Sequence, residues 1–577
     1  MSFKKFFNQF LFLLNKKEKK KIFLSLIFLF VTGILEALSI GLILPITSIV
    51  LDQTRLQEYL GFFNFLSFSN LNYEKTIFFL LLLIFFIYLL KNILLLCSEI
   101  FQINFLFKAQ NRIEYLFYKN YVDLDFKFHK ESNSSKLIQT IIGEIRAYFG
   151  RVIKQSLVLI NEIIVIILIT LVIYLSLPIE SFLLVFGVTF IFFVSYFFSI
   201  RKFITKLGKD WKNAEAGKMN LARQGFDSIS DVKIFQKENF FVKLYNNFNL
   251  LSLRSRKYLS IFQYLPKLLL EMIFISLLVF FLIFIIKKGL DVSLILPQIT
   301  LIVAASFRLM PSVNKLLLAS QSIRYGLPLI NHLIEEQKKF QIQEAKDTAA
   351  NKLMQNEDIS NISCLNISFN YANKLPVLRS VNLKFSLGKM YGIQGANGSG
   401  KSSLAFILSG LFEVTSGEVL INDKKKINYN KILLQNSSYL SQNSFLFDDT
   451  LAANITFDKD LINIENNNFK KVCNLFGIDE IVANYREKMN YMVGENGDNL
   501  SSGQRQKVGL ARTFYFDKKI IILDEATNAI DNKNENKIFE SLTELKKDKI
   551  IIMISHKKDN LNFCDEIMDL DKLNKIN

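Results

Sequence analysis

The sequence predicts a six-helix, all-α membrane domain, followed by a C-terminal α/β domain with a parallel sheet core. Half of the 577 residues are hydrophobic and 56 are Phe, and nearly all long apolar runs lie before residue 331. The remaining residues alternate short apolar and polar stretches, as a soluble α/β domain does. A glycine-rich segment lies between an apolar strand and an apolar helix in that second region.

Six apolar runs approach the roughly 20 residues that a membrane helix needs. Arg308 and Pro311 interrupt the sixth run, which makes it the weakest of the six. No small-residue cleavage site follows the first run, so we expect it to remain as a membrane helix. The runs are residues 22–51, 76–105, 152–177, 179–200, 264–286 and 292–318.

Basic residues are concentrated in alternate connections between these runs. Residues 1–21 hold seven Lys, 106–154 hold nine Lys or Arg, and 201–257 hold thirteen, but 52–75 hold only Arg55 and Lys75. The positive-inside rule therefore puts both termini and the two long basic loops in the cytoplasm of a multi-pass membrane protein. This topology accounts for most of the net charge of +18, so we expect no nucleic-acid partner.

The composition also divides the chain into segments. Apolar residues at helical spacing predict an amphipathic helix on the membrane surface at 1–15, with a frayed basic tail as the alternative. A second short amphipathic helix is expected at 56–63. The membrane domain is then 16–330, with helices that continue well into the cytoplasm. A polar stretch at 331–358 is typical of a linker, and the α/β domain is expected at 359–577.

The sequence GANGSGKS at residues 395–402 follows a candidate strand at 389–394 and precedes an apolar helix at 404–411. Its glycines allow backbone N–H groups to curl around phosphate oxygens, and the following helix adds its positive dipole end. We expect Lys401 to reach the β- and γ-phosphates and the Ser402 hydroxyl to bind Mg²⁺. ATP and Mg²⁺ are therefore the predicted ligands. The predicted phosphate-binding stretch is Gly395, Ala396, Asn397, Gly398, Ser399, Gly400, Lys401, Ser402 and Ser403.

A second element is IIILDE at residues 520–525, where four apolar residues end in two carboxylates. This pattern is typical of a buried strand whose carboxyl end meets a ligand crevice. We expect Asp524 to hold Mg²⁺ and Glu525 to polarise the attacking water. The alternative is a strand followed by solvated acids, which the phosphate loop upstream disfavours.

Between these elements, LSSGQRQ at residues 500–506 opens a helix that continues to residue 516. Here the sequence resembles the ABC ATPase family, whose signature is typically LSGGQ. The resemblance implies that Tyr371 stacks on adenine, that Gln442 contacts Mg²⁺, and that His556 contacts the γ-phosphate. It also identifies 528–531 as the D-loop. The signature residues that it implies for ATP contact are Ser501, Ser502, Gly503 and Gln504.

Three positions depart mildly from the family pattern. Ser502 replaces the usual second glycine of the signature, Asn528 replaces the common Ser, and Lys557 replaces a frequent Arg. The catalytic set of Lys401, Glu525 and His556 is retained, so the resemblance implies an active ATP hydrolase coupled to transport.

The resemblance also implies a partner. In the family, two cassettes face head to tail, and each nucleotide lies between one chain's phosphate loop and the other chain's signature helix. One cassette and six spans are half the usual complement, so we expect an exporter-type half-transporter that works as a homodimer. Residues 126–134 and 228–235 are the candidate coupling segments, with a solvated loop as the alternative for each.

The transported substrate is indicated by the last span. Residues 306–330, with RLMPS at 308–312, resemble the bacterial ABC flippases for lipid-linked oligosaccharides. That resemblance implies an amphipathic polyprenyl-diphosphate glycan whose phosphates Arg308, Lys315 or Lys267 attract, at the bacterial inner membrane. Ionisable residues in membrane helices often mark a pathway, although some are interfacial side chains. Those in the predicted spans are Glu36, Glu99, Glu162, Lys267, Glu271, Arg308 and Lys315.

Other functions stay open at this point. Export of another lipid, such as a lipid A precursor, agrees with the same features. Peptide export is less favoured because no N-terminal peptidase domain precedes the bundle. An ABC-type regulator or channel is a further alternative, which the retained Glu525 disfavours because such a protein can lose this residue.

Overall fold

The computed structural model divides the chain into two compact units. Residues up to 124 and 131–343 form the helical unit, and residues 125–130 and 344 onward form the α/β unit. The predicted surface helix at 1–15 and outer-loop helix at 56–63 lie mostly or wholly outside the described residues. The structure describes residues 11–51, 73–176, 179–288, 292–351, 358–371, 376–426, 428–442, 444–458, 466–483 and 485–574.

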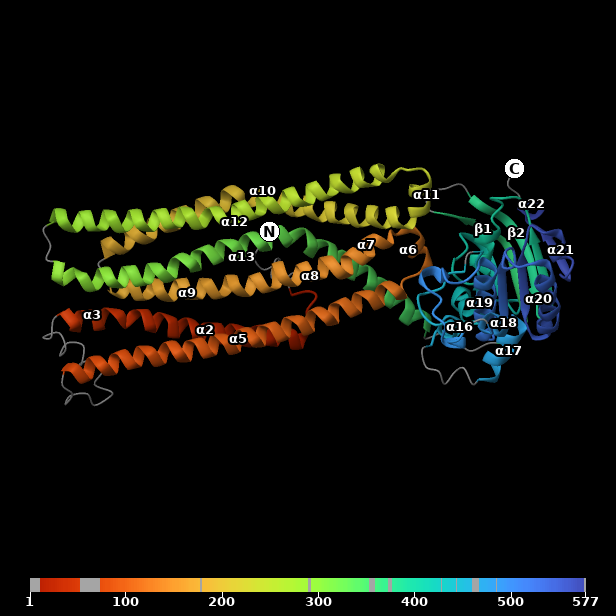
Figure 1. Ribbon diagram of the computed structural model, residues 1–577, viewed down its shortest axis with the longest axis horizontal. Coiled ribbons are helices and arrows are strands. Elements are labelled where there is room, and N and C mark those ends of the chain that lie inside the picture. The colour runs from red at the N-terminus through yellow and green to blue at the C-terminus, as the bar shows by residue number, and fades with distance from the viewer. Residues whose placement is uncertain are drawn as a thin grey trace. The chain divides into compact units, whose positions relative to one another are not determined.

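Long helices make up the helical unit (Figure 1). The first, α2, begins with a capping box in which Asn15 and Glu18 satisfy each other's backbone N–H groups. Two π-helical segments, Gln139–Glu144 and Phe149–Ile153, flank α8. The helices are α2 (Lys16–Gly41), α3 (Ile43–Leu51), α5 (Tyr73–Asp123), α7 (Ser134–Ile138), α8 (Ile145–Tyr148), α9 (Lys154–Ser176), α10 (Ile179–Asp227), α11 (Ile229–Ile234), α12 (Glu238–Lys288) and α13 (Val292–Asn351).

Among the described residues, five helical stretches are long and apolar enough to cross a membrane. They correspond to five of the six predicted spans. The remaining one, 179–200, lies at the start of α10, where most side chains are outside the described set. Pro311 interrupts the sixth apolar run in the sequence, and α13 continues through Pro297, Pro311 and Pro328. Neighbouring helices and local adjustments allow such prolines within membrane helices.

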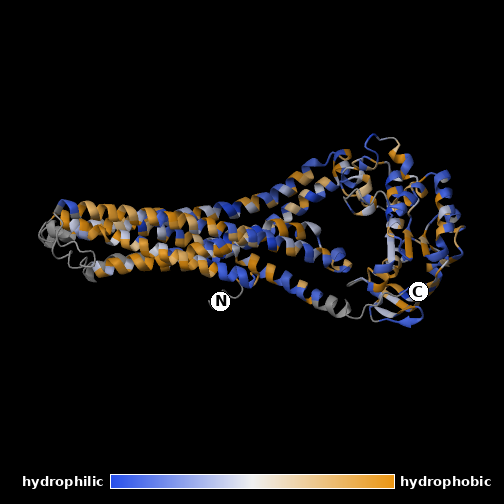
Figure 2. Cartoon of the chain, turned by 90° about the horizontal axis from the view of Figure 1, so that it is seen from below, coloured by the Kyte–Doolittle hydropathy of each residue, from blue (hydrophilic) through white to orange (hydrophobic). Residues whose placement is uncertain are grey.

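Several helices are much longer than a membrane is thick. α5 has 51 residues, or about 75 Å at 1.5 Å per residue, against a hydrocarbon layer of about 30 Å. Figure 2 shows hydrophobic residues gathered in one half of these helices and hydrophilic residues in the other half. α13 also continues to Asn351, so the first part of the predicted linker is helical.

The α/β unit contains two sheets. The five-stranded sheet is parallel, in the order β6-β7-β8-β3-β9, and the four-stranded sheet is antiparallel, in the order β2-β1-β4-β5. The parallel strands are β3 (Met390–Gln394), β6 (Ser437–Leu440), β7 (Ile520–Asp524), β8 (Ile550–Ile554) and β9 (Glu566–Asp569). The antiparallel strands are β1 (Asn361–Asn370), β2 (Pro376–Ser386), β4 (Ser416–Ile421) and β5 (Lys424–Lys425).

Helices cover this unit on both faces of the parallel sheet. In β7, Ile520 and Ile522 face one apolar core, and Ile521 and Leu523 face the other. Because side chains alternate along a strand, burial on both faces explains the continuous apolar sequence of β7 and β8. The helices are α6 (Phe126–Glu131), α14 (Lys401–Leu408), α15 (Tyr429–Asn436), α16 (Leu451–Thr456), α17 (Asn467–Leu475), α18 (Ile478–Val482), α19 (Ser502–Tyr515), α20 (Asn532–Leu545), α21 (Lys558–Leu561) and α22 (Leu570–Leu573).

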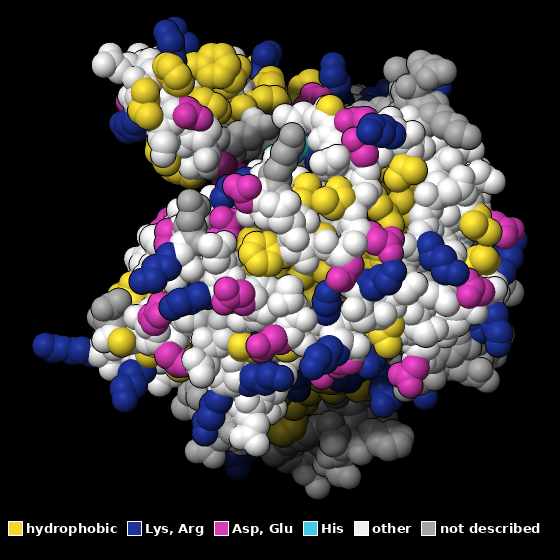
Figure 3. Space-filling view, turned by 90° about the vertical axis from the view of Figure 1, so that its right-hand side faces the viewer, with side chains coloured by type: hydrophobic (Ala, Val, Ile, Leu, Met, Phe, Trp, Pro, Cys, Tyr) yellow, Lys and Arg dark blue, Asp and Glu magenta, His cyan; other side chains and the backbone are white. Residues whose placement is uncertain are grey.

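The face in Figure 3 shows how charge is distributed at the surface. Lys and Arg side chains lie among Asp and Glu there, without one continuous basic patch. The predicted fold class, a helical membrane domain joined to a C-terminal α/β domain with parallel, antiparallel and helical parts, is confirmed.

Candidate nucleotide site

The phosphate loop joins β3 to α14 in the predicted strand–loop–helix order. Gly400 has a φ of 99°, and a Cβ there would lie 2.8 Å from Leu378 Cδ2, so only glycine fits. The Lys401 ammonium lies within the curled loop and donates hydrogen bonds to the carbonyls of Gly395 at 2.9 Å and Ala396 at 2.8 Å. This geometry holds a positive charge beside the backbone N–H groups that the sequence predicted for phosphate.

Glu525 lies where three polar side chains converge. The Gln442 amide donates to its Oε2 at 2.7 Å, and the Asn528 amide donates to the same oxygen at 2.8 Å. His556 Nε2 lies 3.3 Å from the other oxygen, Oε1. The structure therefore brings together three residues from separate segments, Gln442, Glu525 and His556, that the sequence assigned to the ATP site, and it adds Asn528 from the predicted D-loop.

The backbone at Glu525 is itself unusual. Its φ is 51°, in the left-handed region that non-glycine residues seldom adopt. Its N–H donates to the carbonyl of Ile554 at 3.0 Å, just beyond the end of β7. That hydrogen bond ties the turn to β8, so the carboxylate is held at the edge of the sheet rather than left on a loose loop.

Asp524 has a partner that the sequence did not indicate. The Tyr439 hydroxyl, on the neighbouring strand β6, donates a hydrogen bond to Asp524 Oδ2 at 3.0 Å. Burial, and then the Asp524 charge, raise the pKa of Tyr439 far above its usual range, so the hydroxyl remains a donor. A tyrosine in an apolar strand is ordinarily a core residue, and its pairing with the acidic strand is known only from the structure, so no signal in the sequence indicated this contact.

The predicted Mg²⁺ ligands are compatible with the fold. Ser402 lies in the first turn of α14, Gln442 follows β6, and Asp524 ends β7. Carboxyl ends of parallel strands meet at one edge of a sheet, and hydroxyl, amide and carboxylate oxygens suit Mg²⁺, which also keeps water ligands. No cluster of three His, Cys, Asp or Glu that could hold a metal occurs in the described part of the chain.

An aromatic cluster lies beside the nucleotide site. The Tyr371 hydroxyl is 3.0 Å from Ser403 Oγ, and its ring lies 5.8 Å from that of Phe412. Phe126 of α6 packs on Phe406 at 5.2 Å and on Phe412 at 5.6 Å between ring centres. α6, in the predicted coupling segment 126–134, is thus part of the α/β unit, and it contacts Phe412, the same ring that the predicted adenine-stacking residue contacts.

The signature segment caps α19. The Ser501 hydroxyl accepts from Gln504 N, and the Gln504 side chain accepts from Ser501 N, which completes a capping box. A Cβ at Gly503 would lie 2.8 Å from the Ala529 carbonyl. Gln506 accepts from Ala529 N at 2.9 Å, so the signature helix and the D-loop form one connected piece.

Four of the charged residues predicted in the membrane spans form a cluster with Lys91. Arg308 of α13 makes two hydrogen bonds to the Glu36 carboxylate of α2, one of them at 2.8 Å, and Lys91 of α5 lies 3.6 Å from Glu36. Glu162 of α9 lies 3.8 Å from Arg308 and 3.7 Å from Lys315. We call Glu36, Lys91, Glu162, Arg308 and Lys315 the bundle charge cluster.

The three predicted substrate residues differ in their exposure and in their charged neighbours. Arg308 is held by carboxylates, whereas the Lys315 side chain is 54% exposed although it lies near Glu162. Lys267 is exposed and takes part in none of the ion pairs among the described residues. Glu99 pairs with Lys154 at 3.3 Å, with both side chains about half exposed. The substrate role of the three cations stays a prediction.

Comparison with known proteins agrees with this geometry. Residues 378–528 match the family model described as ABC transporter. A lipid A-core flippase of Colwellia psychrerythraea is 34% identical over 277 residues, covering 47% of this chain and 46% of that protein. A probable ABC transporter ATP-binding/permease protein of Haemophilus influenzae is 29% identical over 252 residues, 44% of each chain. The chain thus matches less than half the length of these relatives.

One solved structure resembles nearly the whole chain. A bacterial ABC exporter of the Atm1 family, with ATP bound, superimposes with a TM-score of 0.76 over 97% of this chain and 94% of its own. The sequences are 17% identical, so this similarity concerns the fold. The chain therefore has the fold of an ABC exporter, a helical membrane domain followed by an ABC transporter ATPase domain.

Proposed function

We propose that this protein is an ATP-driven ABC exporter that moves a phosphate-bearing amphipathic lipid across the bacterial inner membrane, with both termini and the ATPase domain in the cytoplasm. The ATPase part of the proposal rests on Glu525, which Gln442, Asn528 and His556 contact together. A carboxylate held beside an imidazole is suited to polarise water for attack on a γ-phosphate. Bound Mg²⁺ would neutralise part of the negative charge on the phosphates.

The lipid part of the proposal rests on the bundle charge cluster. Charged residues in apolar membrane helices are costly and are retained where they serve transport. This cluster holds three cations and two carboxylates, which leaves one positive charge in excess. A phosphate group on the substrate complements that excess, and Lys315 is its most accessible cation.

Two phosphate-bearing lipids are candidates. The RLMPS stretch at 308–312 favours a polyprenyl-diphosphate-linked oligosaccharide, because it resembles the flippases of such lipids. The relatives from Colwellia and Vibrio are named lipid A-core flippases, which favours a lipid A-like substrate. Both lipids carry phosphates at the membrane interface, so both complement the bundle charge cluster equally well. Transport assays must therefore decide between the two substrates.

The proposed working unit is a homodimer. The signature helix α19 and the phosphate loop occur once each in this chain, and in the family a nucleotide is held by one chain's loop and the partner's signature. Large apolar side chains are also exposed along the bundle, among them Phe78, Phe85 and Leu96. Such a surface needs lipid or a second copy to cover it.

Reconstitution tests the proposal directly. Proteoliposomes are prepared with either a fluorescent polyprenyl-diphosphate glycan or a labelled lipid A. The fraction of labelled lipid that an added reagent can reach from outside the vesicle is measured before and after ATP addition. We expect ATP-dependent movement of the glycan lipid, and none with Glu525→Gln protein. Movement of lipid A alone would reassign the substrate, and movement of neither lipid would refute the proposal. An ABC-type regulator or channel would hydrolyse ATP without moving either lipid.

A further inference from the structure

A cavity of about 940 Å³ lies between α10 and α13, entirely within the helical unit. Cavities of this size accept a drug-sized ligand. It is separate from the bundle charge cluster and shares no residue with it. Six of its lining residues are cations: Arg201, Lys202, Lys206, Lys209, Lys212 and Arg324.

Positive charge exceeds negative charge among the residues that line this cavity. Glu335 is the one carboxylate among the lining residues, so six cations less one carboxylate leave a formal charge of +5. Arg201, Lys202, Lys206 and Lys209 take part in none of the ion pairs among the described residues. Cations this close together repel one another, so a multiply charged anion would relieve the repulsion.

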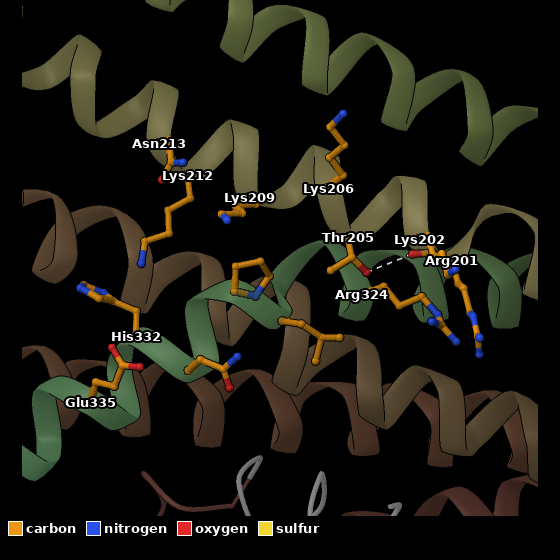
Figure 4. Close-up of a pocket in the computed structure, with 13 residues that line it drawn as sticks. Arg201, Lys202, Thr205, Lys206, Lys209, Lys212, Asn213, Arg324, His332 and Glu335 are labelled. Atoms are coloured by element: carbon orange, nitrogen blue, oxygen red, sulfur yellow. Dashed lines mark hydrogen bonds between the residues drawn. The ribbon is translucent and has the colours of Figure 1, made fainter. Parts of the chain in front are cut away.

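The two ends of the cavity differ in charge balance. Figure 4 shows Lys212 reaching toward His332 at one end, and Arg201 and Arg324 side by side at the other. At the first end the buried Glu144 lies 3.4 Å from Lys212 and 2.7 Å from His332. Burial lowers the pKa of Lys212, and Glu144 opposes that effect. The cations that form no ion pair among the described residues therefore lie at the other end, on α10 between Arg201 and Lys209.

That end coincides with the predicted membrane boundary. The apolar run at 179–200 ends immediately before Arg201, and the basic side of a membrane helix faces the cytoplasm. The four α10 cations then extend over about 12 Å of helix from that boundary. A phosphate group of a lipid in the cytoplasmic leaflet would lie at this depth.

We infer that the cavity between α10 and α13 binds a diphosphate group on the cytoplasmic side of the bundle. The ligand is a diphosphate-bearing lipid or a free diphosphate, which share the chemistry that six cations recognise. Only the choice of a lipid as the source rests on the proposed function.

Binding is tested without turnover, so that failure of transport and failure of this site are distinguishable. The full-length protein carries Lys401→Ala, which removes the phosphate-loop cation. It is titrated with inorganic pyrophosphate, and separately with nanodiscs containing a polyprenyl diphosphate or the corresponding polyprenol. Trp211, the single Trp of the chain, precedes Lys212 and packs against Arg151 and Tyr325, so its fluorescence reports locally. Calorimetry provides an independent measure of pyrophosphate binding.

The decisive variant is Lys206→Gln/Lys209→Gln, which removes two exposed cations that form no ion pair among the described residues. We expect binding to weaken about fivefold for each cation removed. The matched control, Lys237→Gln/Lys243→Gln, removes the same charge from exposed positions of the helical unit outside the cavity. Circular dichroism and thermal unfolding confirm that each variant is folded.

Each outcome decides the matter. Diphosphate lipid bound more tightly than polyprenol, with loss in the cavity variant only, supports the site with a lipid as its source. Binding of pyrophosphate alone, with the same variant dependence, supports it with a free anion as its source. Equal weakening in both double variants would reduce the effect to general surface charge and overturn the inference, as would absence of binding to either probe.

Discussion

The orientation of the Glu525 carboxylate is set by the side chains that contact it. Its carboxylate accepts from Gln442 and Asn528 and lies beside His556, so its orientation is fixed before any substrate arrives. We expect Glu525→Gln to retain ATP binding and to lose ATP turnover by about 10²-fold or more, because an amide does not act as a base. Nucleotide binding and phosphate release, measured on the same sample, check this. Hydrolysis at the wild-type rate would refute the assigned role.

Tyr439 gives a second residue-scale prediction. Tyr439→Phe removes the hydroxyl that donates to Asp524, and a hydrogen bond to a charged group contributes about 1.5–3 kcal/mol. Without it the carboxylate is less well positioned, so we expect the Mg²⁺ concentration for half-maximal ATPase activity to rise about tenfold, with a small change in the maximal rate. A magnesium titration of ATPase activity measures both.

The control for this prediction is Tyr429→Phe. That hydroxyl is also buried and hydrogen-bonded, to the Val414 backbone at 2.9 Å, but it contacts no acidic site residue. Burial raises its pKa to about 12. A similar shift in magnesium dependence for both variants would mean that general packing, rather than the contact with Asp524, is responsible.

The sequence was sufficient to predict most residues of the nucleotide site, but not which of them contact one another. Lys401, Glu525, Gln442 and His556 were predicted because each belongs to a motif with fixed chemistry. Tyr439 was missed because its partner lies 85 positions away in the sequence. A hydrogen bond between neighbouring strands depends on register, which one sequence does not reveal.

At the scale of helices, the bundle charge cluster joins segments that the sequence could only list separately. Glu36 and Arg308 are 272 positions apart, and their ion pair joins α2 to α13. Similarly, α13 continues to Asn351, into the segment that the composition predicted as a linker. Helix positions were therefore predictable from hydropathy, whereas helix partners and the full length of α13 were not.

The cluster makes a testable contribution to helix packing. Glu36→Gln leaves Arg308 and Lys91 without their shared carboxylate, and breaking a buried ion pair costs about 3–5 kcal/mol. We expect a lower thermal unfolding temperature in detergent, partly restored in Glu36→Gln/Arg308→Gln. Thermal unfolding of the purified variants, followed by circular dichroism, measures both effects.

Glu99→Gln is the matched control for the cluster. Its pair with Lys154 has both side chains about half exposed, and such pairs contribute about 0–1 kcal/mol. The unfolding temperature should therefore change little. An equal loss of stability in Glu99→Gln and Glu36→Gln would indicate that any carboxylate in the bundle matters, and the cluster would lose its special role.

At the scale of the whole molecule, a single ATPase domain and a single helical bundle predict that activity requires two copies. We expect detergent-purified, ATP-hydrolysing protein to have the mass of a dimer, and dilution that produces monomers to abolish hydrolysis. Light scattering coupled to gel filtration, with ATPase assays on each fraction, measures this. A fully active monomer would contradict the shared-site arrangement.

The ATPase unit is discontinuous along the chain. Phe126 in α6 packs on Phe406 and Phe412, although residues 131–343 of the helical unit lie between this segment and the rest of its unit. During synthesis, the segment leaves the ribosome long before the aromatic surface that receives it exists. Completion of the ATPase unit must therefore wait until residues 131–343 of the bundle have been synthesised.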